Sequence, residues 1–137
     1  MIDLVGKKIL AIRRDPKSWH LAFETDQGTV GYRGAYYGAD NETWFHHVVG
    51  VPFLLGAKVL RVDTVPEHKS YPATRLEVTE PGKESQRTHD KVLGWKLYTD
   101  KGTAKVEMRN SSNRTEVYLF EEAHEVPPYA QLVTEDF

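Results

Sequence analysis

The chain of 137 residues is 39% hydrophobic and 28% charged, the balance of one folded domain rather than of a disordered segment. It contains no cysteine, which excludes disulfides, thiolate metal ligands and cysteine nucleophiles and is typical of a reducing compartment. The formal net charge of −2 makes nucleic acid an unexpected partner, because binding of nucleic acid needs a strongly basic face. No apolar run is long enough to cross a membrane and no signal peptide opens the chain, so we expect a cytoplasmic protein without a membrane partner.

Alternating apolar and polar residues predict three strands at the start of the chain, near residues 7–14, 19–25 and 29–33. Thr-Asp-Gln-Gly-Thr at residues 25–29 joins the second strand to the third. The Asp side chain can accept a hydrogen bond from the backbone two residues on, and Gly adopts a positive φ without strain. The segment therefore predicts a β-hairpin.

A long connection with many aromatic residues follows these strands. It is irregular through residues 36–40 and continues as Thr-Trp-Phe-His-His-Val at residues 43–48. Residues 51–55 then predict a short helical turn, which Gly56 ends.

The second half of the chain repeats the design of the first. We expect strands near residues 58–65, 75–79, 90–98, 103–109 and 116–121. The turn Thr-Asp-Lys-Gly-Thr at residues 99–103 is nearly the same as the earlier one.

Two sequence offsets indicate an internal repeat. Residues 4–12 match residues 54–62 at an offset of 50, whereas the hairpin turns are 74 residues apart, so we interpret residues 66–89 as an insertion. The pseudo-repeats are residues 4–34 and 54–110, and each predicts one three-stranded antiparallel meander. A meander cannot bury its apolar face alone, so the two should pack face to face or share one strongly curved sheet, related by a pseudo-twofold axis.

The fold class predicted is therefore all-β or β-rich α+β, with residues 1–126 as a single domain. Residues 127–137 form an acidic tail, which Pro127 and Pro128 should separate from the main sheet. The tail is expected either to be one more edge strand, near residues 129–133, or to be free to lie disordered or to pair with a second copy.

Aromatic and arginine residues suggest a site for a small anionic ligand. Tyrosines in the connection could stack a base, while Arg guanidinium groups and the polar Arg-Asn-Ser-Ser-Asn run could bind phosphate. Packing of a core beneath a long connection, and a polar hairpin turn, explain the same residues. The candidate ligand-binding residues are Arg33, Tyr36, Tyr37, Trp44, His46, Arg109, Asn110, Ser111 and Asn113.

A metal site is the alternative, built from Asp40, Glu42, His46 and His47, because imidazole and carboxylate suit zinc, iron or manganese. On a strand, however, adjacent histidines point to opposite faces, and on a helix they diverge by about 100°, so the two do not readily share one ion. We therefore expect no metal or other cofactor, and no catalytic residue is assigned.

Several segments together resemble a domain-of-unknown-function family of small bacteriophage and bacterial proteins. They are DLVGK at residues 3–7, FETDxG at 23–28, ETW at 42–44, LLG at 54–56, KLxTDxG at 96–102 and RNSSN at 109–113. The resemblance implies a phage or mobile-element context and supplies no activity.

We expect a phage-type accessory binding protein without catalysis, which captures a small nucleotide-like anion or a host protein and thereby counters host defence. A metal-assisted hydrolase at Asp40, Glu42, His46 and His47 is one alternative. A phage structural or assembly component, which associates into a homo-oligomer through exposed strand edges, is the other.

Overall fold

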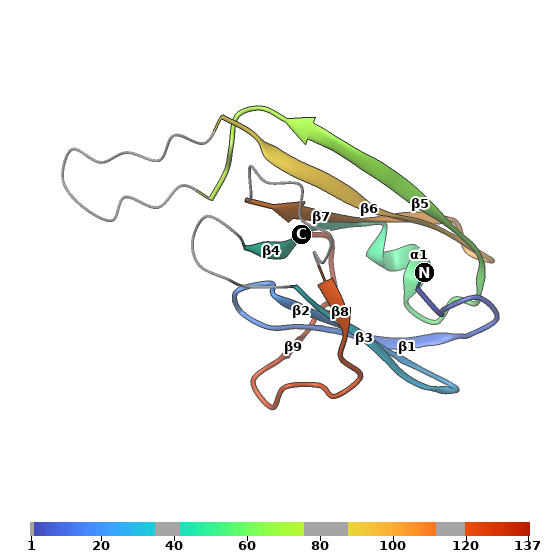
Figure 1. Ribbon diagram of the computed structural model, residues 1–137. Helices are drawn as coiled ribbons and strands as arrows, with labels where there is room; N and C mark the ends of the chain where they lie inside the picture. Colours follow the sequence, from blue (N-terminus) through green and yellow to red (C-terminus); the bar gives the residue numbers. More distant parts are fainter. Residues whose placement is uncertain (1, 35–41, 76–87, 112–119) are drawn as a thin grey trace.

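Two antiparallel β-sheets face each other and enclose the hydrophobic core (Figure 1). The computed structural model describes residues 2–34, 42–75, 88–111 and 120–137. The first sheet contains β1 (Ile9–Arg14), β2 (His20–Thr25), β3 (Gly28–Gly34), β8 (Phe120–Glu122) and β9 (Gln131–Leu132), in the order β8-β3-β2-β1-β9. The second contains β4 (Thr43–Val49), β5 (Val59–Ser70), β6 (Asp90–Thr99) and β7 (Thr103–Asn110), in the order β4-β7-β6-β5.

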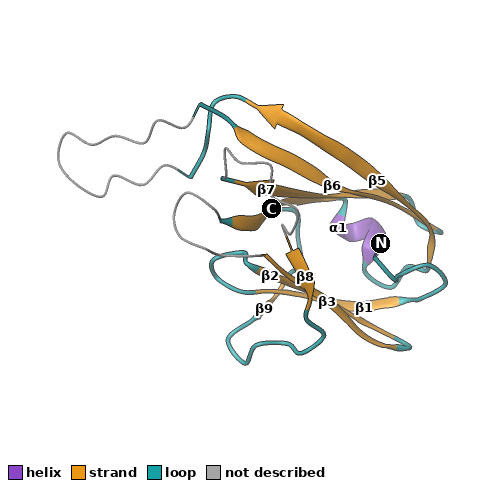
Figure 2. Ribbon diagram, viewed as in Figure 1, coloured by secondary structure: helices purple, strands orange, loops and turns teal. Residues whose placement is uncertain are grey.

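The predicted β-rich architecture of two meanders is confirmed. Strands β1 to β3 form one meander and β5 to β7 form the other, each in its own sheet, so the sheets pack as a small sandwich. The predicted helical turn is α1 (Val51–Leu54), the short purple helix that lies between the two sheets in Figure 2. Within the described part of the chain, no helix is long and apolar enough to cross a membrane.

The core lies between the sheets and follows the alternation of the strands. In β7 the side chains of Ala104, Val106 and Met108 are buried, while the residues between them point outward. In β2 Leu21 and Phe23 are fully buried and belong to the same apolar cluster. The period-2 pattern thus places one face of each sheet against the other.

A reciprocal set of backbone bonds joins the two meanders just before β1 and β5. Lys8 pairs with Lys58 in an antiparallel bridge. The Gly6 N–H donates to the carbonyl of Val59 at 2.8 Å, and the Gly56 N–H donates to the carbonyl of Ile9 at 2.7 Å. Each bond becomes the other when 50 is added to or subtracted from the residue numbers, as a local pseudo-twofold axis requires. Both glycines have positive φ, 83° and 73°, which a side chain disfavours.

The two hairpin turns also make the same contacts. Asp26 accepts the backbone N–H of Lys8 at 2.9 Å, and Asp100 accepts that of Lys58, also at 2.9 Å. Within each turn the threonine hydroxyl donates to the glycine carbonyl, from Thr25 to Gly28 and from Thr99 to Gly102. The carboxylate therefore ties the tip of each hairpin to the start of its own meander, in addition to shaping the turn.

The second meander is longer than the first because β5 continues through Pro66 to Ser70. The predicted strand ended at Val65, before the proline. A register shift between Val65 and His68 leaves Pro66 in a bulge, and β5 is the edge strand of its sheet, so the missing N–H of proline costs no ladder bond. Of the predicted strand at 75–79, Arg75 lies outside any strand and the rest lies outside the described residues, as do residues 116–119.

Pro127 and Pro128 do not separate the tail from the sheet, and the prediction that they would was wrong. Strand β9 pairs with β1 of the same chain, and the N–H of the buried Val133 donates to the carbonyl of Ile12 at 2.8 Å. The edge-strand alternative thus describes this segment, although β9 is shorter than the predicted 129–133. Apolar Val133 and Phe137 contact the core, which an unattached acidic tail could not do.

Candidate metal centre

A β-bulge in β4 brings His46 and His47 to the same face of the second sheet. Phe45 lies opposite Met108 and His47 lies opposite Glu107, so His46 is an extra residue that β7 does not match. The bulge lets both Phe45 and Val48 point into the core, where each is fully buried, although they are three residues apart. The expectation that the two histidines point to opposite faces was therefore wrong, because it assumed a regular strand.

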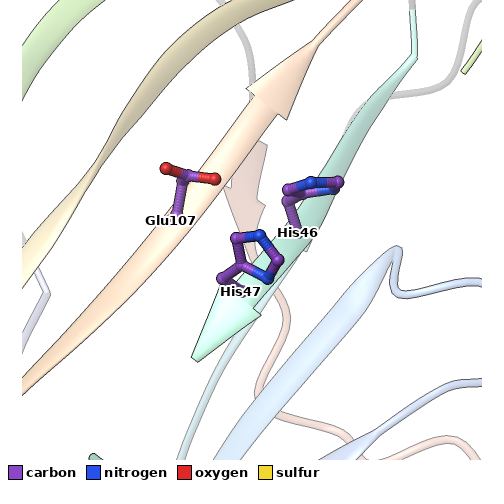
Figure 3. Close-up of side chains that lie close together, drawn as sticks. All are labelled: His46, His47 and Glu107. Carbon is purple, nitrogen blue, oxygen red and sulfur yellow. The ribbon is translucent and has the colours of Figure 1, made fainter. Parts of the chain in front are cut away.

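The two histidines and Glu107 form a compact cluster on the outer face of this sheet (Figure 3). One ligand atom from each residue lies within 4.8 Å of the others, and the two imidazole centroids are 4.2 Å apart. His47 is exposed, whereas His46 and Glu107 are half-buried. Two imidazoles and one carboxylate are the ligand set of many zinc and non-haem iron sites, which keep further coordination positions open.

The neighbours of His47 and Glu107 suit metal binding. The main-chain oxygen of Phe137 can only accept, so Nδ1 of His47 donates to it at 3.1 Å and the lone pair is on Nε2. Oε2 of Glu107 accepts from Nε of Arg109 at 3.1 Å, which leaves Oε1 for an ion. A ligating histidine that donates its second N–H to a carbonyl is the usual arrangement around protein-bound metals.

His46 is held differently, because the indole N–H of Trp44 donates to its Nδ1 at 3.0 Å. The neutral ring then carries its proton on Nε2. An ion at Nε2 would move this proton to Nδ1, and the new Nδ1–H would then face the indole N–H of Trp44, which is also a donor. Binding of a metal to His46 therefore has to break the bond from Trp44. Burial, with Arg109 and His47 nearby, lowers the pKa of His46 below its ordinary value, which keeps the ring neutral near pH 7.

Two further charged residues, Arg109 and Asp90, lie beside the cluster. Arg109 is only 12% exposed at its side chain and lies between two carboxylates, with Nη1 at 3.0 Å from Asp90 Oδ2. Asp90 is fully buried and also accepts from the Thr74 hydroxyl at 2.6 Å. Glu107 thus offers a carboxylate that an ion at the two histidines would share with Arg109.

Trp44 is covered by Arg75 and does not present an exposed ring on which a ligand could stack. Its side chain is fully buried outside the main core cluster, and the guanidinium of Arg75 lies 4.5 Å from its ring centroid. Arg75 also forms an ion pair with Glu42 at 2.9 Å. Glu42, which also accepts from the Trp19 indole, is therefore occupied in packing and does not join the histidines.

The structure brings together Trp44, His46 and Arg109 from the predicted anion site and places the other described members elsewhere. Asn110 is buried and donates to the Thr43 hydroxyl at 2.8 Å, and the hydroxyl of the buried Ser111 accepts the N–H of Glu42. Arg33 lies in the first sheet, paired with Glu121. The remaining predicted residues lie outside the described residues; they are Tyr36, Tyr37, Asp40 and Asn113.

Sequence reasoning missed Glu107, which lies sixty residues after the histidines and joins them only through the pairing of β4 with β7. The sequence contains one sign of the bulge. Phe45 and Val48 are both apolar but lie three positions apart, whereas residues on one face of a regular half-buried strand are an even number of positions apart.

Comparisons with protein-family models, with curated proteins and with solved structures find no significant match.

Proposed function

We propose that the protein binds a divalent transition-metal ion through His46, His47 and Glu107, and that the bound ion captures a small anionic ligand. The observation that carries the proposal is the bulge at His46, which places two imidazoles and a carboxylate within 4.8 Å on one face. Bulges re-aim side chains in this way next to many functional sites.

Three protein ligands do not fill the coordination sphere of such an ion. A tetrahedral zinc ion would keep one position, and an octahedral iron or manganese ion would keep three. A phosphate or carboxylate oxygen can occupy these positions. This makes the expectation of an anion-binding protein more specific. The metal ion, rather than Arg guanidinium groups, would be the main group that binds the anion.

Calorimetric titration with Zn²⁺, Mn²⁺ and Co²⁺ tests the metal site. We expect one ion per chain, with binding at least tenfold weaker in the variants His47→Gln and Glu107→Gln, because each removes a ligand. His68→Gln is the matched control, since His68 is an exposed histidine of β5 outside the cluster. Equal affinities of His47→Gln and His68→Gln would contradict the proposal.

The Co²⁺-loaded protein tests the anion. Its visible absorption should change when inorganic phosphate or adenosine monophosphate takes an open position, whereas sodium chloride at equal ionic strength should leave it unchanged. A spectrum that neither phosphate compound alters would restrict the function to metal binding. Steady release of phosphate from the nucleotide would instead favour the hydrolase alternative, with Glu107 in place of Asp40 and Glu42.

A further inference from the structure

The C-terminal segment 131–137 links the two sheets. Its first part is β9, which pairs with the edge of the first sheet at β1. Its last residue pairs with β4, the edge of the second sheet: Phe137 N–H donates to the Val48 carbonyl at 3.2 Å, and Val48 N–H donates to the Phe137 main-chain oxygen at 3.0 Å. The segment thus crosses from one sheet to the other beside the metal cluster.

Two side chains hold the end of this segment in place. Oδ1 of Asp136 accepts the backbone N–H groups of Gly50 and Val51, at 3.0 and 2.8 Å, at the start of α1. The ring of Phe137 lies beneath the guanidinium of Arg14, 3.6 Å from the ring centroid. Together these contacts fix the position of the Phe137 main-chain oxygen.

That oxygen is also the partner of His47. It accepts the Nδ1–H of the imidazole at 3.1 Å and so fixes both the orientation of the ring and the tautomer with a lone pair on Nε2. A metal ion on Nε2 would in turn hold the proton on Nδ1 and make it a stronger donor to this oxygen. Docking of the segment therefore favours metal binding, and metal binding favours docking.

We infer that docking of segment 131–137 and binding of a metal ion at His47 are coupled, with Phe137 as a positioning residue for His47. The inference rests on the proposed function. Coupling of two equilibria is reciprocal, so loosening the segment should weaken metal binding, and metal binding should protect the segment by the same free energy. Loss of a partner that orients a ligating histidine typically weakens metal binding by about 10- to 100-fold.

Asp136→Ala tests the coupling without altering a ligand, because it removes the two bonds to Gly50 and Val51. Glu135→Ala is the matched control, since it removes the same charge from an exposed neighbouring residue. We expect calorimetric titration with Zn²⁺ to show binding at least tenfold weaker in Asp136→Ala and within twofold of wild type in Glu135→Ala. If Asp136→Ala does not fold, Arg14→Leu loosens the segment by removing the contact with Phe137.

Hydrogen exchange provides a readout that would not change on addition of Zn²⁺ if segment 131–137 had only a structural role. Zn²⁺ should slow exchange of the Val133 and Phe137 amides in the wild type, and this slowing should be lost in His47→Gln. Equal affinities of Asp136→Ala and Glu135→Ala, or unchanged exchange in a wild type that binds Zn²⁺, would overturn the coupling and leave the metal site standing. A wild type that binds no metal would overturn both.

Discussion

Lys8 and Lys58 pair with each other across the junction of the two meanders, although 50 residues separate them and each occupies the same place in its own unit. Asp26 and Asp100 fix the two lysine backbones by equal bonds of 2.9 Å. The junction therefore depends on two carboxylates in equivalent positions.

Asp26→Ala and Asp100→Ala should destabilise the protein by similar amounts. Each removes one side-chain bond to a backbone N–H, which is worth about 1 kcal/mol in the free energy of unfolding. Urea denaturation of the two variants measures this. Asp3→Ala is the control, because Asp3 forms an exposed ion pair with Lys7 that should contribute about 0–1 kcal/mol. A cost at one turn alone would show that the two hairpins are not energetically equivalent.

Deleting His46 should remove the bulge and leave the fold intact. The shortened strand keeps Phe45 and Val48 facing the core and His47 opposite Glu107, while the ion loses one ligand. Circular dichroism should report an unchanged sheet, and Zn²⁺ affinity should fall at least as far as in His47→Gln. Deleting the exposed Lys96 is the comparison, since β6 pairs with β7 without a bulge and a deletion there turns neighbouring residues to the wrong face. A deletion at His46 as damaging as that at Lys96 would contradict this account of the bulge.

Trp44→Phe should strengthen metal binding while weakening the fold. The change removes the indole N–H that donates to Nδ1 of His46. Metal binding then no longer has to break this hydrogen bond, which corresponds to a gain of about three- to tenfold in affinity. Calorimetric titration with Zn²⁺ measures the gain. Trp95→Phe, at a buried core position, should lower the melting temperature without raising the affinity. Unchanged affinity in Trp44→Phe would mean that the ion does not engage His46.

Asp136 should make stability depend on pH in the acid range. The N–H groups of Gly50 and Val51 lower the pKa of Asp136 below its ordinary value, so the folded state binds the proton less tightly than the unfolded state does. The stabilisation is therefore fully present above the ordinary pKa, near 3.8, and is lost as the pH falls through the lower pKa of the folded state. Urea denaturation should show wild type more stable than Asp136→Ala at pH 6, with the difference shrinking below about pH 4. A difference that stays constant down to pH 2.5 would exclude this linkage.

The meanders and their turns could be predicted because the information that specifies them is local. Period-2 alternation identifies strands, and Thr-Asp-x-Gly-Thr contains the side chains that close its own turn, as the bonds of Thr25 and Thr99 show. The position of Pro66 inside β5 was not predictable in this way, because proline interrupts a strand unless it lies on an edge or in a bulge. Both conditions are set by tertiary pairing.

The metal cluster could be predicted only in part, because Glu107 reaches the histidines through the register of β4 against β7. His46 and His47 attract attention as neighbours, yet a bulge decides whether they share a face. An edge strand near residues 129–133 was one of the predicted alternatives, but the docking of the residues after it was not predicted, for a related reason. The acidic composition of the tail hides Val133, Asp136 and Phe137, each of which has a specific partner elsewhere in the chain.

The reciprocal bonds around Lys8 and Lys58 have a consequence for the origin of such a chain. A surface related to its partner by a twofold axis is self-complementary, so a polypeptide containing one meander alone would present the matching edge to an identical molecule. Two such molecules would associate head to head with the same reciprocal backbone bonds that now lie within one chain. Fusion of two such molecules would turn an intermolecular contact, which depends on concentration, into a permanent one, and would free each half to diverge: here the second meander has the longer hairpin, and the first sheet pairs with β9.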